Sequence, residues 1–231
     1  MRALLLPIKD LRKAKQRLAQ VLPTEERMAL AQAMLEDTAR AVAALRAGVL
    51  DGPRVLTKVF VVTTYEPAME LAAQNGWEVL REEEQISESA SVDFASRLCA
   101  ERGVTGLLRL PLDLPLVQPG DISDLLTAPC EAPALVMVPS RDGTGTNAIL
   151  RTPPALFPSH FGPNSFAKHL REAEQAGARI ILRRNARLEM DVDDEADLRA
   201  LLERDLTGTK TGAWLEESGV AARLRWRAAS R

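Results

Sequence analysis

The sequence predicts an α/β fold in which a mostly parallel sheet carries helices on both faces. Two observations lead to this prediction. Short apolar, often β-branched runs typical of buried strands alternate with longer segments whose apolar residues recur every three or four positions. Most of these segments end at Gly or Pro. Alternation of this kind is typical of parallel strands joined by crossover helices, that is, of a single Rossmann-like domain.

The expected strands are short and apolar. Three leucines in a row mark the first strand, and Pro7 ends it because proline cannot donate to a sheet ladder. A β-branched run marks the second, and Pro111 closes the fourth. In chain order the expected strands cover residues 2–6, 59–62, 77–80, 107–110, 134–138 and 179–182.

The expected helices lie between these strands. The first begins at Thr24, a capping residue that is followed by Glu25 and Glu26, whose charges suit the first turn of a helix. It ends near Gly48, before a loop at Gly52-Pro53. The later helices cover residues 67–76, 92–103, 121–126, 165–176 and 194–203.

Length, charge and residue counts exclude several classes of protein. The 231 residues are expected to form one domain over residues 1–206 and a loosely ordered tail over residues 207–231. Thirty basic and 32 acidic side chains leave a net charge of −2, which argues against a nucleic-acid partner. Two Cys and two His exclude a disulfide framework and a Cys/His zinc site. The sequence lacks a membrane-spanning run and a secretory leader, so we expect a cytoplasmic protein without a membrane partner.

Three familiar catalytic motifs are missing from the sequence. The phosphate loop G-x-x-x-x-G-K-[ST] does not occur, and no G-x-G-x-x-G follows the first strand. The G-x-S-x-G motif is also absent. A P-loop kinase, a Rossmann dehydrogenase and an α/β-hydrolase are therefore disfavoured.

A cationic segment follows the first expected strand. It places five cations within nine residues: Lys9, Arg12, Lys13, Lys15 and Arg17. One interpretation is a solvent-exposed charged face. The other is a loop whose cations neutralise a triphosphate.

Aspartates follow two later strands. Asp113 lies among apolar residues and prolines, where a carboxylate is costly to bury unless a metal or hydrogen bonds compensate; otherwise it is a turn or cap residue. Alternation places Asp191 and Asp193 on one side, where they repel unless a cation lies between them. The alternative is that Asp193 or Asp194 caps the last helix. Carboxylates, with waters and substrate phosphates, are the usual ligands of Mg²⁺.

Two glycine-containing loops complete the candidate site. They cover residues 140–147 and 161–165, where glycines allow a ligand to approach and hydroxyls can hold a phosphate or carboxylate. Ser165 also opens a helix, so capping is its alternative role. His169, farther along that helix, is interpreted as a packed or surface residue rather than a catalytic one.

Together these segments resemble the 2-phospho-L-lactate and phosphoenolpyruvate guanylyltransferase family. The motifs occur in the family's order from residue 2 to about residue 202: Pro7-x-Lys9, Ala14-Lys15-x-Arg17-Leu18, Arg27, Met34-Leu35-x-Asp37, Leu112-Asp113-Leu114-Pro115-Leu116, Asp142-Gly143-x-Gly145-Thr146-Asn147, Phe161-Gly162-x-x-Ser165-Phe166 with His169, and Asp191-Val192-Asp193. One segment departs from the pattern. Where the family usually has Gly-Leu-Asn before the third helix, this chain has Glu88-Ser89-Ala90-Ser91-Val92-Asp93.

The resemblance implies a nucleotide-diphospho-sugar transferase fold, with residues 1–206 as the nucleotidyltransferase domain. It also implies Mg²⁺-dependent transfer of GMP from GTP to a three-carbon phosphoacid, early in the biosynthesis of coenzyme F(420). The predicted residues fall into groups. They are Asp113, Asp191 and Lys15 for catalysis; Asp113, Asp191 and Asp193 for the metal; Pro7, Lys9, Lys15, Arg17 and Ser91 for the nucleotide; and Thr146, Gly162 and Ser165 for the phosphoacid.

The expected reaction needs no general base. A phosphomonoester has its second pKa near about 6, so its dianion can attack the α-phosphorus of GTP and displace pyrophosphate. The sequence leaves the acid open among 2-phospho-L-lactate, phosphoenolpyruvate and 3-phosphoglycerate. We expect functional coupling to the downstream transferase, and a homodimer stays open. The alternatives are a cytidylyl- or guanylyltransferase for another acceptor, such as the molybdenum cofactor, and a non-catalytic nucleotide-binding protein.

Overall fold

The computed structural model describes residues 1–46 and 58–229. Its sheet has the strand order β3-β2-β1-β4-β6-β5-β7. Every strand pairs in parallel with its neighbours except β6, which is antiparallel to β4 and β5. The mostly parallel sheet is therefore confirmed. The strands are β1 (Arg2–Pro7), β2 (Lys58–Thr63), β3 (Glu78–Arg81), β4 (Gly106–Arg109), β5 (Ala134–Pro139), β6 (Thr146–Thr152) and β7 (Arg179–Leu182).

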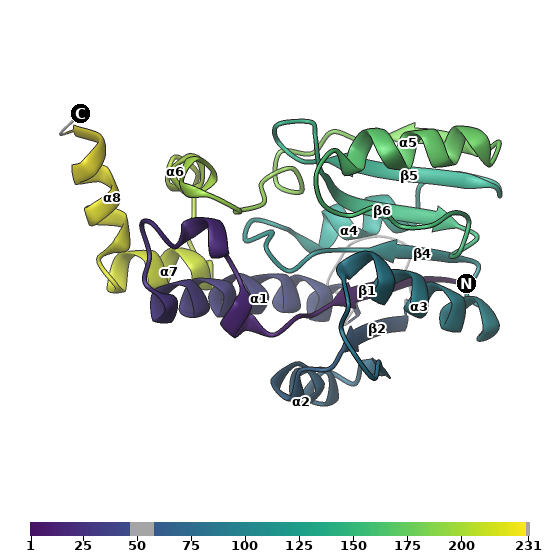
Figure 1. The fold of residues 1–231 in the computed structure, drawn as a ribbon, viewed down its shortest axis with the longest axis horizontal. Coiled ribbons are helices and arrows are strands. Elements are labelled where there is room, and N and C mark those ends of the chain that lie inside the picture. The colour runs from purple at the N-terminus through teal and green to yellow at the C-terminus, as the bar shows by residue number, and fades with distance from the viewer. Residues whose placement is uncertain (47–57, 230–231) are drawn as a thin grey trace.

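Helices connect most of these strands (Figure 1). They are α1 (Thr24–Arg46), α2 (Glu66–Gln74), α3 (Glu88–Glu101), α4 (Pro119–Leu126), α5 (Ser165–Gln175), α6 (Glu195–Leu202), α7 (Lys210–Glu217) and α8 (Val220–Ala229), with 3-10 turns η1 (Leu11–Lys13) and η2 (Gln16–Leu18). The expected helix end near Gly48 and the loop at Gly52-Pro53 lie outside the described residues. Within the described ranges, no helix is long and apolar enough to cross a bilayer.

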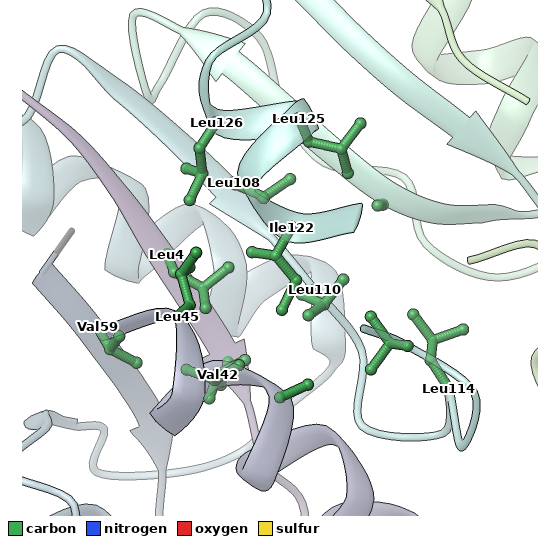
Figure 2. Packing of buried hydrophobic residues seen from close by; sticks show 14 of the residues in the cluster. Leu4, Val42, Leu45, Val59, Leu108, Leu110, Leu114, Ile122, Leu125 and Leu126 are labelled. Atoms are coloured by element: carbon green, nitrogen blue, oxygen red, sulfur yellow. The ribbon is translucent and has the colours of Figure 1, made fainter. Parts of the chain in front are cut away.

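Alternation along the strands builds a core on each face of the sheet. Leu4 and Leu6 of β1 belong to a buried cluster with α1, α2 and α4, and Figure 2 shows Leu4 beside Leu45 of α1. Ala3 and Leu5 point the other way and pack with residues of α3. Helix α5 covers β5 and β6 on that second face. The prediction of helices on both faces is confirmed.

Strand β6 is the strand that the sequence analysis did not predict. Its sixth residue is the buried Arg151, which interrupts the apolar run that marks the other strands. The Arg151 guanidinium donates to the Phe157 carbonyl at 2.5 Å and to Ser96 Oγ at 2.7 Å. Because β6 runs against its neighbours, its first residues lie at the edge of the sheet where β4 ends. That direction brings Thr146 to the candidate site.

The structure differs from the expectation of a loosely ordered tail over residues 207–231. Helices α7 and α8 follow residue 209, and Leu215, Val220 and Leu224 are buried in a cluster with α1 and α6. The polar residues that suggested a tail form a helix start, because the Thr209 side chain accepts a hydrogen bond from the N–H of Gly212 at 2.9 Å. We call this cluster of α6, α7, α8 and part of α1 the C-terminal cluster.

Candidate active site

The candidate site lies where the strand order reverses. From β1 the chain moves through β2 and β3 on one side and then returns to place β4 on the other. Ligands of open α/β sheets bind beyond the carboxyl ends of strands at such a reversal. Two adjoining cavities open there, of about 830 and about 510 Å³, which we call the cationic cavity and the glycine-loop cavity. Both are lined by Glu88, Arg109, Pro111, Asp113 and Asp193.

The cationic cavity contains most of the segment that follows β1. Pro7, Lys9 and Lys15 line it, in line with the predicted nucleotide site. Arg17 lines the glycine-loop cavity instead, and its guanidinium lies 3.8 Å from the carboxylate of Asp193. Part of this segment therefore faces a cavity rather than forming a purely solvent-exposed face.

Ser91, which was predicted to contact the nucleotide, is not among the residues that line either cavity. The residue is fully buried in α3. Its Oγ lies 2.9 Å from both the Glu82 carboxylate and the Ser87 carbonyl. A helical hydroxyl that bonds the preceding turn in this way has no proton left for a ligand.

Lys15 is the central cation of the site. Its backbone is left-handed, with φ of 53°, and this turn directs the side chain inward until only 8% of it is exposed. Nζ donates to Asp113 Oδ2 at 2.6 Å and to Asp193 Oδ1 at 3.2 Å. Burial alone would lower the pKa of Lys15, but the charges of Asp113 and Asp193 outweigh it and raise the pKa to about 12. Lys15 therefore stays charged.

The carboxylate of Asp113 is stabilised by the same ion pair. Burial favours its protonated form, but the charge and hydrogen bond of Lys15 outweigh burial and hold the pKa of Asp113 below its usual range. Asp113 is thus an ionised group beside a lysine rather than a turn or cap residue.

Asp191 is the carboxylate that Lys15 does not neutralise. Its carboxylate accepts a hydrogen bond from Asn147 Nδ2 at 3.1 Å. Burial and then the charge of Asp113 raise the pKa of Asp191 to about 6. Burial and the charge of Asp113 both disfavour the ionised carboxylate, and a divalent cation would offset both.

The carboxylates of the site can hold Mg²⁺ if waters and substrate phosphates supply its remaining ligands. In residues 1–46 and 58–229, no three carboxylate, imidazole or thiol groups converge closely enough to enclose a metal ion. Mg²⁺ commonly takes one or two carboxylates and completes its shell with waters and substrate phosphates. Asp113 and Asp191 fit that pattern, with Asp193 held by Lys15 and Arg17. Asp194, not Asp193, caps α6 by accepting the N–H groups of Ala196 and Asp197.

Thr146, Gly162 and Ser165 all line the glycine-loop cavity, as predicted. The structure does not bear out a capping role for Ser165, because the N-cap of α5 is Asn164, in a left-handed conformation with φ of 57°. Ser165 Oγ donates instead to Thr146 Oγ1 at 3.3 Å. The backbone φ of Gly162 is 112°, a value that residues with a side chain rarely adopt, so this turn requires glycine.

His169 fixes the direction of the Thr146 hydroxyl. The histidine is fully buried, and its Nε2 accepts the backbone N–H of His160 at 2.8 Å. The proton of the neutral ring is therefore on Nδ1, which lies 3.0 Å from Thr146 Oγ1 and donates to it. Burial lowers the pKa of His169 to about 3, so the ring stays neutral. Thr146 Oγ1 accepts from His169, and its own proton points to Met137 Sδ at 3.7 Å, a weak acceptor that a ligand oxygen in the cavity would replace.

Sequence reasoning missed two charged residues at the junction of the cavities. Arg109 is hidden in the apolar run of β4, and Glu88 in an acidic stretch. Their ion pair joins positions 21 residues apart, a separation that no local pattern marks. The one available signal was the departure of residues 88–93 from the family pattern, since Glu88 begins that segment.

Comparison with solved structures defines the class first. The fold matches a protein described as a nucleotide-diphospho-sugar transferase from Desulfovibrio desulfuricans, with a TM-score of 0.75, 15% identity and 96% of both chains covered. It also matches a cytidylyltransferase from Leptospira borgpetersenii with a TM-score of 0.53 and 14% identity, over 95% of both chains. The chain therefore has the nucleotide-diphospho-sugar transferase fold, with its candidate site at the strand reversal.

Sequence comparison then gives the family. The model of the family described as "Guanylyl transferase CofC like" matches residues 1–229, and the chain belongs to that family. A phosphoenolpyruvate guanylyltransferase from Rubrobacter xylanophilus is 38% identical over 84% of this chain and 90% of its own. A 3-phospho-D-glycerate guanylyltransferase from Phenylobacterium zucineum is 32% identical over 93% of this chain and 94% of its own. A 2-phospho-L-lactate guanylyltransferase from Methanothermobacter thermautotrophicus is 29% identical over 86% of this chain and 82% of its own.

Proposed function

We propose that this protein transfers GMP from GTP to a three-carbon phosphoacid and releases pyrophosphate. One observation carries the proposal: a cavity lined by lysines and a cavity lined by hydroxyls and a glycine turn meet at the carboxylate of Asp113. The first suits a triphosphate and the second suits a small acid. The acids named for the relatives are phosphoenolpyruvate, 2-phospho-L-lactate and 3-phospho-D-glycerate. The cytoplasm and an early step of coenzyme F(420) biosynthesis are the proposed setting.

The residues of this chain bind and orient two anions. Lys9 and Lys15 line the cationic cavity and offset the charge of the triphosphate. The Thr146 hydroxyl, directed by His169, and the turn from Gly162 to Ser165 hold the phosphoacid. Its phosphate oxygen then attacks the α-phosphorus in line, and pyrophosphate leaves toward the lysines. The attacking phosphate is already largely dianionic, so no residue has to remove a proton.

Asp113 and Asp191 are the proposed ligands of Mg²⁺, with Asp193 beside them. When bound, the ion would neutralise charge on the phosphates and help to align them. The burial of Asp191 next to the charge of Asp113, which together raise its pKa, supports this assignment. Lys15 holds Asp113 and Asp193 in place through its two hydrogen bonds.

Pyrophosphate release tests the proposal. Each of the three acids is paired with GTP, CTP, ATP and UTP, with Mg²⁺ or with EDTA, and the downstream transferase is added in case the product is unstable. We expect release with GTP and at least one acid, and none with EDTA. Release with CTP but not GTP would favour a cytidylyltransferase. Nucleotide binding without release under every condition would favour a non-catalytic binding protein.

A further inference from the structure

A buried arginine lies between the two cavities. The Arg109 side chain is 8% exposed and lines both of them. Its guanidinium donates to the Asn147 carbonyl at 3.0 Å and stacks over the Phe161 ring, with Cζ at 4.3 Å from the centroid. Its Nε is buried without a hydrogen-bond partner. A guanidinium held this firmly, with so little water around it, requires an anion.

In this structure the anion is the carboxylate of Glu88. Glu88 is the first residue of α3, and its carboxylate accepts a hydrogen bond from the Arg109 guanidinium. The other oxygen of the same carboxylate lies 3.7 Å from Lys9 Nζ. One glutamate therefore neutralises two cations at the junction. Its side chain is 25% exposed, so it can leave toward solvent without unfolding α3.

The proposed reaction brings a phosphate to this place. The new bond joins the α-phosphorus of the nucleotide to a phosphate oxygen of the acceptor, so these two groups must meet where the two cavities meet. Two anions approach each other only if nearby cations offset their repulsion. Lys15 lines the cationic cavity alone and is assigned to the triphosphate, and Arg17 is mostly exposed. Arg109 is the buried cation that faces both cavities.

We propose that Arg109 binds the phosphate of the acceptor, and that Glu88 is a resident counter-ion which this phosphate displaces. The inference rests on the proposed function and adds a binding residue to it. Arginine suits the role because its planar donors match two phosphate oxygens at once. Glu88 keeps the guanidinium charged and in place before substrate arrives, and its charge competes with the substrate for the same donors.

If Glu88 competes with the phosphate for Arg109, removing its charge should lower the KM for the phosphoacid. Glu88→Gln removes the competing charge but keeps the size of the side chain, so we expect the KM for the phosphoacid to fall about threefold to tenfold, with a smaller change in the KM for GTP. Arg109→Gln should raise the phosphoacid KM about tenfold to a hundredfold. Arg109→Lys keeps the charge without the planar donors and should lie between. Glu101→Gln is the matched control, since Glu101 is the exposed last residue of the same helix.

The double variant separates the exchange from a general effect of charge. In the Arg109→Gln background, Glu88→Gln should no longer tighten phosphoacid binding, because the donors that Glu88 masks are gone. An equal gain in both backgrounds would overturn the proposal. A rise in the phosphoacid KM of Glu88→Gln, with an unchanged unfolding midpoint, would also overturn it, since Glu88 would then assist binding.

Calorimetric titration with phosphoenolpyruvate, in Mg²⁺ and without nucleotide, separates this inference from the proposed function. If the wild-type protein releases no pyrophosphate with any acid, the proposed function fails. The titration still tests the exchange, because Glu88→Gln should tighten phosphoenolpyruvate binding and Arg109→Lys should weaken it. Unchanged binding in both variants, in a wild-type protein that does bind the acid, would refute the inference alone.

Discussion

Asp191→Asn should stabilise the protein while it removes activity. The Asp191 carboxylate is half-buried beside Asp113, and within residues 1–46 and 58–229 it forms no ion pair, so its ionised form destabilises the metal-free fold. The amide is nearly isosteric and can still accept the hydrogen bond from Asn147 Nδ2. It cannot neutralise a metal ion, and loss of one charge-stabilising group commonly lowers turnover by about 10²–10³.

The magnitude follows from the pKa of Asp191. It lies at about 6 in the folded protein against 3.8 for the free side chain, and each unit corresponds to about 1.4 kcal/mol. The upper limit is therefore about 3 kcal/mol, and partial solvation reduces it to about 1–2 kcal/mol. At this chain length that stabilisation would raise the unfolding midpoint by about 2–8 °C.

The pH dependence has a definite sign. The pKa of Asp191 is raised in the folded protein, so the carboxyl favours folding only while it is neutral. This contribution to the free energy of unfolding is complete below about pH 4 and is lost as pH rises through about 6. The gain of Asp191→Asn over wild type should thus be largest near pH 8 and shrink at pH 5. Thermal unfolding in EDTA at both pH values measures it. Mg²⁺ should raise the midpoint of the wild type and not of the variant.

Asp113→Asn is the contrasting control. The pKa of Asp113 is lowered by Lys15, so its ionised form is favourable, and its loss leaves the buried lysine with Asp193 alone. That variant should be destabilised at pH 8. The electrostatic reasoning would be refuted if the Asp191→Asn variant were less stable than wild type at pH 8 in EDTA. It would also be refuted if the gain in stability at pH 5 equalled the gain at pH 8.

Four further outcomes are expected. Lys15→Ala should raise the KM for GTP more than that for the phosphoacid in initial-rate assays, and unchanged GTP kinetics would remove Lys15 from the nucleotide site. Ser165→Ala should raise the phosphoacid KM without moving the unfolding midpoint, whereas a loss of about 0.5–2 kcal/mol with normal kinetics would restore the capping role. In His169→Asn the amide nitrogen can replace Nδ1 as the donor to Thr146, so the phosphoacid KM should stay the same. In His169→Gln the amide replaces only Nε2, the acceptor of the His160 N–H, so the phosphoacid KM should rise. Equal effects of the two substitutions would indicate that His169 acts through packing alone. Leu215→Ala should lower the free energy of unfolding in urea by about 2–5 kcal/mol, and a negligible loss would mean that α7 is not part of the core.

Local signals predicted the fold where they were strong. Strand β1 is an unbroken apolar run, and Thr24 with its two glutamates marks the start of α1. Strand β6 escaped prediction because Arg151 is buried by distant partners, Ser96 and Phe157, that no local pattern reveals. The C-terminal helices escaped because their apolar residues are few and separated by polar ones, and their burial depends on α1.

Site residues could be predicted where an acidic residue stands among apolar neighbours in the sequence, which implies that its side chain is buried. Asp113 is surrounded by apolar residues and prolines, and Asp191 alternates with Met190 and Val192, so their unusual positions were visible. The bond of Ser91 to Glu82 could not be predicted, because it depends on how α3 packs. The Arg109–Glu88 pair could not be predicted because it forms only once β4 and α3 lie side by side.

The two carboxylates proposed for the metal are flanked by residues of different hydrophobic clusters. Asp113 follows β4 of the sheet, whereas Asp191 is flanked by Met190 and Val192, which are buried in the C-terminal cluster. Within the cluster, α7 is tied to α1 partly through Asp37, whose carboxylate accepts the N–H of Thr211 at 2.9 Å. Local opening of the cluster would separate Asp191 from Asp113 while the sheet stays folded. The free energy of this opening, rather than of global unfolding, therefore sets the fraction of molecules with an assembled site, and hydrogen exchange in α7 would measure it.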